Sequence, residues 1–234
     1  MEINRKAIKH NSLLLIAQTK PSPILVVLAY LLIDTVLLQL SLKISGEEKF
    51  VNDLLAEYQK GNFNYIPPTP TPGFSACLLV AALGIMCVML FAGLLLYCLQ
   101  ICQQNKAGVG NLFDGFALFP KVLGLFLVEL LFIYLWSLLL VVPGIIAAFR
   151  YRQAFYLLLE NPELGILECL RRSTQMMDGH KWELFMLDLS FLGWYILTWL
   201  PGAIVWVEPY TRITYTNYYL ALRDMPQNTF DKTV

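Results

Sequence analysis

Seven ionisable side chains lie inside long apolar stretches of the sequence, where charged residues are rare. They are Asp34, Glu129, Arg150, Arg152, Asp188, Glu208 and Arg212. An ionised side chain that faces hydrocarbon alone costs several kcal/mol, so such residues face inward, pair with one another or line water. The sequence therefore predicts a polar cluster at membrane depth. The expected pairs are Arg150 or Arg152 with Glu208, and Arg212 with Glu129 or Asp188.

This polar cluster has two interpretations. In the first, a polar cavity between two similar halves of the chain binds an anionic or zwitterionic solute, since transporters commonly place their sites between repeats. In the second, the charges form structural ion pairs that fix how the helices pack. Residue type and spacing favour neither interpretation decisively, so both stay open at this point.

Patterns for other chemistry are weak. His180 with Asp178 and Glu183 could supply a general base or metal ligands, but a helix cap and turn explains the same residues.

The five cysteines lack a CxxC pair and fall mostly in apolar runs, where a thiol behaves as a small hydrophobe. The zinc-protease, serine-hydrolase and phosphate-loop signatures are absent. We therefore predict no metal, no cofactor and no enzyme activity, with an intramembrane lipid enzyme using Glu129, Asp188 and His180 as the weaker alternative.

Composition indicates which solvent surrounds the chain. Of the 234 residues, 57% are apolar and 15% charged, and the mean hydropathy is +0.58, whereas soluble domains contain about 25% charged residues. Seventeen basic and 17 acidic residues cancel, so no overall field favours a nucleic-acid partner. The predicted partner is the lipid bilayer, and nucleic acid is not expected.

Apolar segments long enough to cross a bilayer recur along the chain. Residues 24–42 and 76–99 each suffice for a hydrocarbon core about 30 Å thick. Two similar passages follow, 135–159 and 194–222, each with an apolar run, a Pro-Gly pair and a stretch containing arginine and tyrosine. Proline lacks a backbone donor and glycine admits positive φ, so each pair marks either a turn between helices or a kink.

The distribution of lysine and arginine favours turns, because these residues concentrate in cytoplasmic loops. With both Pro-Gly pairs as outer turns, the cytoplasmic segments contain eleven basic residues and the outer loop three. If the Pro-Gly pairs are instead kinks within helices, the chain crosses the membrane four times, with nine basic residues inside and eight outside. The sequence thus predicts an all-α, polytopic transmembrane bundle with six spans, two Pro-Gly hairpins as a pseudo-repeat, and both termini in the cytoplasm. The fourth span, residues 145–160, would rise only about 24 Å.

The remaining segments complete a single integral membrane domain over residues 1–234. Residues 1–22 are predicted to be a cytoplasmic amphipathic segment, and residues 161–181 an amphipathic helix along the inner membrane surface. Residues 43–75 are charged and then rich in proline, which predicts an extracytoplasmic loop that contains a short helix near residues 50–58. Residues 224–234 are predicted to be a cytoplasmic tail.

Several short motifs in the second half are shared with a known family. They are Pro143-Gly144-Ile145-Ile146-Ala147, Arg150-Tyr151, Asn161-Pro162, Met176-Met177-Asp178-Gly179-His180-Lys181, Leu189-Ser190-Phe191-Leu192-Gly193-Trp194 and Val207-Glu208-Pro209-Tyr210. Over residues 120–223 the chain resembles predicted bacterial integral membrane proteins catalogued as a domain of unknown function, number 975. More distantly it resembles the membrane domain attached to some glycerophosphodiester phosphodiesterases. The resemblance implies a six-span protein of the bacterial cytoplasmic membrane, and it implies no activity and no catalytic residue.

Function is therefore predicted as two main hypotheses. The first is a non-enzymatic accessory protein, such as a transporter partner or an envelope stress or immunity factor, which docks on another membrane protein through residues 161–181. The second is a small-molecule or peptide transporter that uses the polar cluster as an intramembrane cavity.

Overall fold

The computed structural model describes residues 4–20, 22–200 and 202–225. Every regular element in these residues is a helix. In chain order they are α1 (Arg5–Gln18), α2 (Pro23–Ser45), α3 (Glu47–Gln59), α4 (Phe74–Cys102), the 3₁₀ helix η1 (Val109–Leu118), α5 (Phe119–Leu139), α6 (Val141–Tyr151), α7 (Ala154–Glu160), α8 (Ile166–Met176), α9 (Lys181–Leu197) and α10 (Ile204–Arg223). Nearly all of the tail predicted for residues 224–234 lies outside the described residues.

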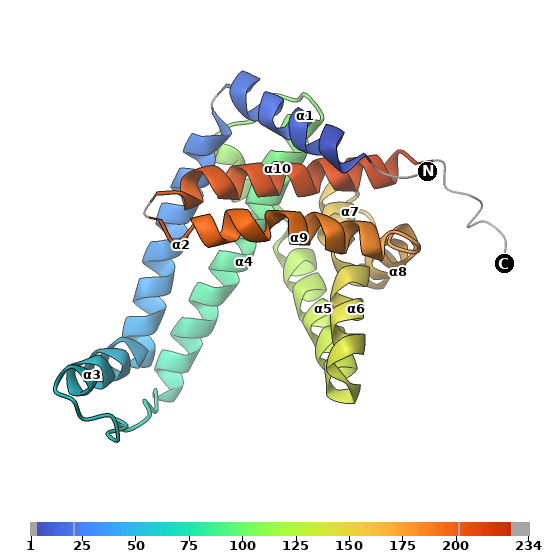
Figure 1. Ribbon diagram of the computed structural model, residues 1–234. Helices are drawn as coiled ribbons and strands as arrows, with labels where there is room; N and C mark the ends of the chain where they lie inside the picture. The colour runs from blue at the N-terminus through green and yellow to red at the C-terminus, as the bar shows by residue number, and fades with distance from the viewer. Residues whose placement is uncertain (1–3, 21, 201, 226–234) are drawn as a thin grey trace.

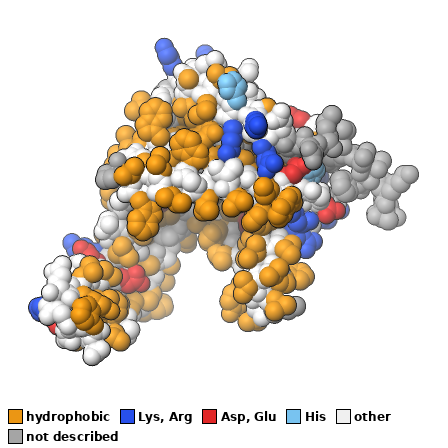
Figure 2. Space-filling model, viewed as in Figure 1, with side chains coloured by type: hydrophobic (Ala, Val, Ile, Leu, Met, Phe, Trp, Pro, Cys, Tyr) orange, Lys and Arg blue, Asp and Glu red, His pale blue; other side chains and the backbone are white. Residues whose placement is uncertain are grey.

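Three helical stretches in the described part of the chain are long and apolar enough to cross a bilayer. They are Pro23–Ser45, Phe74–Cys102 and Val109–Leu138. Figure 1 shows two legs, one made of α2 and α4 and the other of α5 and α6, which diverge below α1, α9 and α10. Hydrophobic side chains dominate the visible face of the α5–α6 leg, whereas charged side chains are mixed with them at the lower end of the other leg (Figure 2). The chain is thus an all-helical membrane protein, as composition predicts.

Proline and glycine define both ends of α2. Pro23 begins the helix, where its missing N–H would have no helical partner in any case. The helix ends at Gly46, whose φ of +82° lies in the left-handed region that glycine adopts without strain. α3 begins at the next residue. Residues 43–75, predicted to be a loop with a short helix, therefore include the last turn of α2 and the whole of α3.

The short helix η1 folds back along the upper half of α4 because two glycines allow the backbones to touch. A Cβ atom on Gly93 of α4 would lie 1.9 Å from the carbonyl oxygen of Leu112 in η1. A Cβ atom on Gly115 of η1 would lie 2.3 Å from the carbonyl oxygen of Met89. This contact fixes η1 against α4 directly before α5 begins at Phe119.

The predicted fourth span, residues 145–160, is not one helix. α6 ends at Tyr151 and α7 begins at Ala154. At the break, the Ser173 hydroxyl of α8 donates to the carbonyl oxygen of Arg150 at 2.7 Å and accepts from the N–H of Gln153 at 3.2 Å. A buried hydroxyl thus satisfies backbone groups that lose their helical partners at the break.

Both Pro-Gly pairs lie close to reversals of the chain. The reversal between α5 and α6 is at Leu140, and Pro143-Gly144 fall in the first turn of α6. Residues 198–203 separate α9 from α10, with Gly202 at φ +86°; Pro201 lies outside the described residues. In Figure 1 the α5–α6 hairpin follows the direction of a leg, whereas α9 and α10 run across α2 and α4. The two hairpins therefore differ in orientation.

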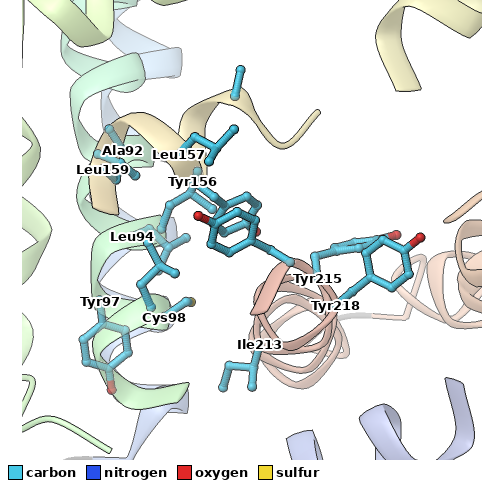
Figure 3. Close-up of a cluster of buried hydrophobic side chains, with 14 of the residues drawn as sticks. Ala92, Leu94, Tyr97, Cys98, Tyr156, Leu157, Leu159, Ile213, Tyr215 and Tyr218 are labelled. Atoms are coloured by element: carbon cyan, nitrogen blue, oxygen red, sulfur yellow. The ribbon is translucent and has the colours of Figure 1, made fainter. Parts of the chain in front are cut away.

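The core gathers where α4, α7 and α10 meet, as Figure 3 shows. Its labelled side chains are Ala92, Leu94, Tyr97 and Cys98 of α4, Tyr156, Leu157 and Leu159 of α7, and Ile213, Tyr215 and Tyr218 of α10. α10 is polar for so buried a helix. Its threonines Thr211, Thr214 and Thr216 donate to carbonyl oxygens three or four residues earlier, so their hydroxyls are buried without a loss of hydrogen bonding.

The predicted amphipathic segment at residues 1–22 contains α1, which packs on α10. Its buried residues Ile8, Ser12 and Ile16 recur every four positions and form one face. The Ser12 hydroxyl accepts from the Asn217 side-chain amide of α10 at 2.9 Å, and Lys9 Nζ donates to the Ser190 hydroxyl of α9 at 2.6 Å. The inner face of α1 therefore contacts the protein.

Within residues 161–181, the helix is α8, at 166–176. On its exposed side, Glu168 bonds Arg171 Nε at 2.9 Å and Arg172 Nε at 2.7 Å. The hydrogen bonds from Arg171 and Arg172 lower the pKa of the Glu168 carboxyl from 4.5 to about 2.

We expect Glu168→Gln to lower the melting temperature of the purified protein slightly at neutral pH, because a surface ion pair contributes less than about 1 kcal/mol. The folded-state pKa is depressed, so this contribution is present above the unfolded pKa of 4.5 and is lost as the pH falls toward 2. Thermal unfolding in detergent at several pH values checks this. Glu163→Gln, a change at an exposed residue just before α8, is the control, and a wild-type advantage over Glu168→Gln that grows on acidification would contradict the prediction.

Candidate functional site

Arg152, at the break between α6 and α7, forms an ion pair with Asp188 of α9. Arg152 Nη1 and Asp188 Oδ2 are 2.7 Å apart. The other carboxylate oxygen of Asp188 accepts from the Tyr215 hydroxyl of α10 at 2.7 Å. The guanidinium carbon of Arg152 also lies 4.5 Å from the centre of the Tyr215 ring, in cation–π contact. One network thus joins the helix break to α9 and α10.

A second ion pair lies within α10. Arg212 Nε and Nη2 are each 2.7 Å from Glu208 Oε1, one helical turn earlier. The guanidinium carbon lies 4.9 Å from the centre of the Phe91 ring of α4. The Glu208 side chain is 15% exposed. This pair is therefore held between α10 and α4.

The predicted pairings of these charges are wrong. Arg152 pairs with Asp188 rather than with Glu208, because the helix break directs it toward α9. Arg212 pairs with Glu208 rather than with Glu129 or Asp188, because the two residues are neighbours on one helix face. The sequence thus indicated the charged residues that form these ion pairs, but it did not indicate which residue pairs with which.

Two cavities adjoin next to these ion pairs. The smaller, of about 240 Å³, lies among α4, α5, α6, α7 and α10; its polar lining residues are Glu129, Arg152, Gln153, Tyr156, Arg212 and Tyr215. The larger, of about 380 Å³, lies among α2, α4, α5 and α7, and its lining includes Asp34 and Glu129. Both cavities share Glu129, Phe91, Ile133 and Phe155 as lining residues. Glu129 therefore stands at the junction of the two.

Two residues that line the smaller cavity each have a buried side-chain oxygen without a hydrogen-bond partner. The two atoms are Glu129 Oε2 and Gln153 Oε1. Gln153 is only 2% exposed, and its amide nitrogen lies 3.6 Å from the sulfur of Met177. A buried polar atom without a partner costs roughly 1–3 kcal/mol, and native proteins contain few of them. Of the three such side-chain atoms among the described residues, two belong to residues that line this cavity.

The structure thus brings six of the seven predicted residues to the cavities or to the ion pairs beside them. Arg150 is the exception, since its side chain lines neither cavity and its backbone carbonyl bonds Ser173. Sequence reasoning did not select Gln153 and Tyr156 for the site because they carry no charge, and it assigned Tyr215 to anchoring at the membrane interface in preference to lining a substrate site. The available signal for Gln153 was a polar side chain directly after Arg152 in an apolar run.

The alternative group around His180 forms the start of α9. His180 Nδ1 lies 2.9 Å from Glu183 Oε2, and Lys181 Nζ lies 3.3 Å from Asp178 Oδ1. Gly179, just before, has φ +79°. Over the described ranges, no three His, Cys, Asp or Glu side chains come together as a metal site requires. These contacts are local to the turn before α9 and to its first turn, and the His180 side chain makes no capping hydrogen bond there.

Three membrane-length helices, with paired charges around cavities between helices, define a helical integral membrane protein. The pattern of the family described as "Protein of unknown function (DUF975)" matches residues 124–225, which confirms the resemblance. The matched part contains Glu129, Gln153 and both ion pairs, whereas Asp34 and the α4 wall lie outside it. Neither curated proteins nor solved structures yielded a match.

Proposed function

We propose that the protein binds a small molecule in the cavities around Glu129 and carries it across the membrane. The observation that supports this most is the unpartnered Oε1 atom of Gln153, a residue that lines the smaller cavity. A polar network that serves stability alone is satisfied internally, because each unpaired buried group weakens the fold. Rotation of the two side chains toward the cavity would let a bound molecule with hydrogen-bond donors satisfy both Gln153 Oε1 and Glu129 Oε2.

The helix break supports transport in particular. Transporters commonly form their sites from discontinuous helices, whose unwound residues present polar groups to the substrate. Here the residues at the break are Arg152 and Gln153, which form a turn with right-handed helical backbone angles, and both line the smaller cavity. The break therefore coincides with the proposed binding site.

Extraction of the detergent-purified protein, followed by mass spectrometry of the extract, tests the binding. We expect a small molecule in stoichiometric amount from the wild type and little from Gln153→Leu. Removing an unsatisfied oxygen should leave this variant at least as stable as the wild type. Gln39→Leu, a change at an exposed residue of α2, should retain the molecule. Equal yields from all three proteins, or none from the wild type, would contradict the proposal. Binding without uptake into liposomes would contradict the transport step alone.

We also propose the orientation in the membrane. In Figure 1, α3 and the α5–α6 turn lie at the same lower end, which supports at least four crossings by α2, α4, α5 and the α6–α7 pair. Six crossings additionally require α9 and α10 to span. In both arrangements α1 and α8 lie on the cytoplasmic side of a bacterial plasma membrane.

Cysteine labelling in intact cells separates four crossings from six. Val141 and Trp199 are 73% and 92% exposed beside the two reversals, so Val141→Cys and Trp199→Cys in a Cys77→Ser background place a reactive thiol at each. The glycines of the Pro-Gly pairs are less suitable, because a Cβ on Gly144 would lie 2.1 Å from the Ser137 hydroxyl. Six crossings predict that a membrane-impermeant maleimide labels both cysteines. Labelling of Val141→Cys alone indicates four crossings. Absence of labelling at position 141 would contradict the proposed orientation.

An accessory role in a larger membrane complex stays a prediction. The segment 161–181 would be its docking surface, and stoichiometric co-purification of a second membrane protein would support it. Small-molecule binding is preferred because the unpartnered oxygens favour it directly.

A further inference from the structure

We propose that the larger cavity binds an amphipathic organic cation, that is, a molecule with one positively charged centre on an aromatic or aliphatic body. This assignment rests on the proposed small-molecule function and names its ligand class. It differs from the anionic or zwitterionic solute that the sequence suggested. The reason is that Asp34 and Glu129, two carboxylates without a basic partner among the described residues, both line this cavity.

The lining of the larger cavity contains two carboxylates and no basic side chain. Asp34 comes from α2 and Glu129 from α5. The nearby arginines are already paired, Arg152 with Asp188 and Arg212 with Glu208. A carboxylate in apolar surroundings must be protonated or balanced by a cation, since its charge is otherwise costly to bury. The cavity is therefore complementary to positive charge.

The rest of this lining suits an apolar body. It consists of Tyr30, Phe91, Phe126 and Phe155 together with Cys87, Val88, Leu130 and Ile133. Aromatic faces attract organic cations by cation–π interaction, and quaternary ammonium groups are often recognised in this way. A metal ion would lack ligands here, because in the described parts of the chain no three metal-ligating side chains converge. A volume of about 380 Å³ also exceeds what a small ion fills.

The position of the cavity gives such a molecule a route of entry. Most of the lining comes from α2, α4 and α5, with Phe155 of α7, and Figure 2 shows the molecule hollowed between the two legs that contain α2, α4 and α5. The surrounding faces are hydrophobic, so a ligand with an apolar body can partition into the bilayer and enter sideways. Its charged centre would then meet Asp34 and Glu129.

Two ions of nearly the same shape and opposite charge test the assignment. Binding of tetraphenylphosphonium and of tetraphenylborate to the full-length protein in detergent is measured by equilibrium dialysis. We expect saturable binding of the phosphonium, and binding of the borate at least about tenfold weaker, which corresponds to about 1.4 kcal/mol. Equal affinity for the two ions would overturn the assignment, because shape and apolarity alone would then explain binding.

Neutral carboxamides at the two acidic positions test the residues. Asp34→Asn and Glu129→Gln should each weaken phosphonium binding by about tenfold or more. The matched controls are Asp53→Asn and Glu48→Gln on α3, both exposed and away from the cavity. They should bind like the wild type. Unchanged binding in the cavity variants would overturn the assignment.

A measurement on the unmodified chain avoids any variant that fails to fold. Cys87 lines the cavity, and Cys77 is exposed at the start of α4. Tetraphenylphosphonium should slow alkylation of Cys87 by N-ethylmaleimide and leave Cys77 unaffected, as peptide mass spectrometry can resolve. Equal rates with and without the ion would overturn the assignment.

The two proposals can fail separately. A co-purifying molecule without positive charge, together with absent phosphonium binding, would overturn the cation assignment and leave the small-molecule function standing. Absence of both a co-purifying molecule and phosphonium binding would overturn both. Charge-selective binding that depends on Asp34 and Glu129 would support the cation assignment.

Discussion

Replacing Gly93 by alanine is expected to destabilise the protein by about 3 kcal/mol, because extra atoms forced into a packed interface cost this much. The added Cβ would lie 1.9 Å from the carbonyl oxygen of Leu112 and 2.5 Å from its carbonyl carbon. Both are backbone atoms, so no side chain can rotate away. We expect η1 to separate from α4, with faster hydrogen exchange over η1 and a lower melting temperature in detergent.

Gly84→Ala is the matched control for this change. Gly84 lies in α4 as well, and a Cβ there would meet nothing within 4 Å. Alanine is a better helix former than glycine by about 1 kcal/mol, so this variant should be as stable as the wild type or slightly more stable. Gly115→Ala, on the other side of the contact, should resemble Gly93→Ala. Similar melting temperatures for the changes at 84 and 93 would show that the close approach of η1 is not required.

Replacing Asp188 by asparagine is expected to lower stability by about 2 kcal/mol. Removing one partner of a fully buried ion pair costs 3–5 kcal/mol, and we expect less here because the Arg152 side chain is 37% exposed. The change also removes the charge from the acceptor of the Tyr215 hydroxyl. Thermal or denaturant unfolding of the purified protein measures the effect.

A double-mutant cycle identifies the partner. Arg152→Met combined with Asp188→Asn should lose about 1–2 kcal/mol less than the sum of the single changes, since the second change removes a group that is already unpaired. Arg150→Met combined with Glu208→Gln, a pair suggested by the sequence, should show additive losses. Additivity for Arg152 and Asp188, or strong coupling for Arg150 and Glu208, would contradict the observed pairing.

The sequence predicts the first half of the fold better than the second. α2 and α4 coincide closely with apolar segments found by length alone, because a helix is the only way such a segment can satisfy its backbone in a bilayer. For α9 and α10, residues 198–203 contain no charged residue. The number of lysines and arginines outside the membrane is therefore the same whether this pair crosses the membrane or lies on its inner side. Charge placement alone cannot separate these arrangements.

The candidate site shows a similar division. Because burying charge is costly, the sequence indicated Asp34, Glu129, Arg152 and Arg212 as members of a polar site. It could not identify Arg152's partner, because Arg152 is oriented by a helix break that Ser173 stabilises from a different helix. It also missed Gln153, since an amide has no charge by which an apolar run reveals it. Contacts between distant segments decide both features.

The packing of α1 on α10 has a consequence for the order in which the protein is made. Ser12 and Asn217, which are joined by a hydrogen bond, are 205 positions apart in the chain. Ribosomes add about 5–20 residues per second, so α1 leaves the ribosome many seconds before its partner exists. During that interval its apolar face is available to the membrane surface or to a chaperone. Final assembly therefore waits for the last helix, and a chain truncated before α10 would leave the Ile8, Ser12 and Ile16 face of α1 without the helix on which it packs.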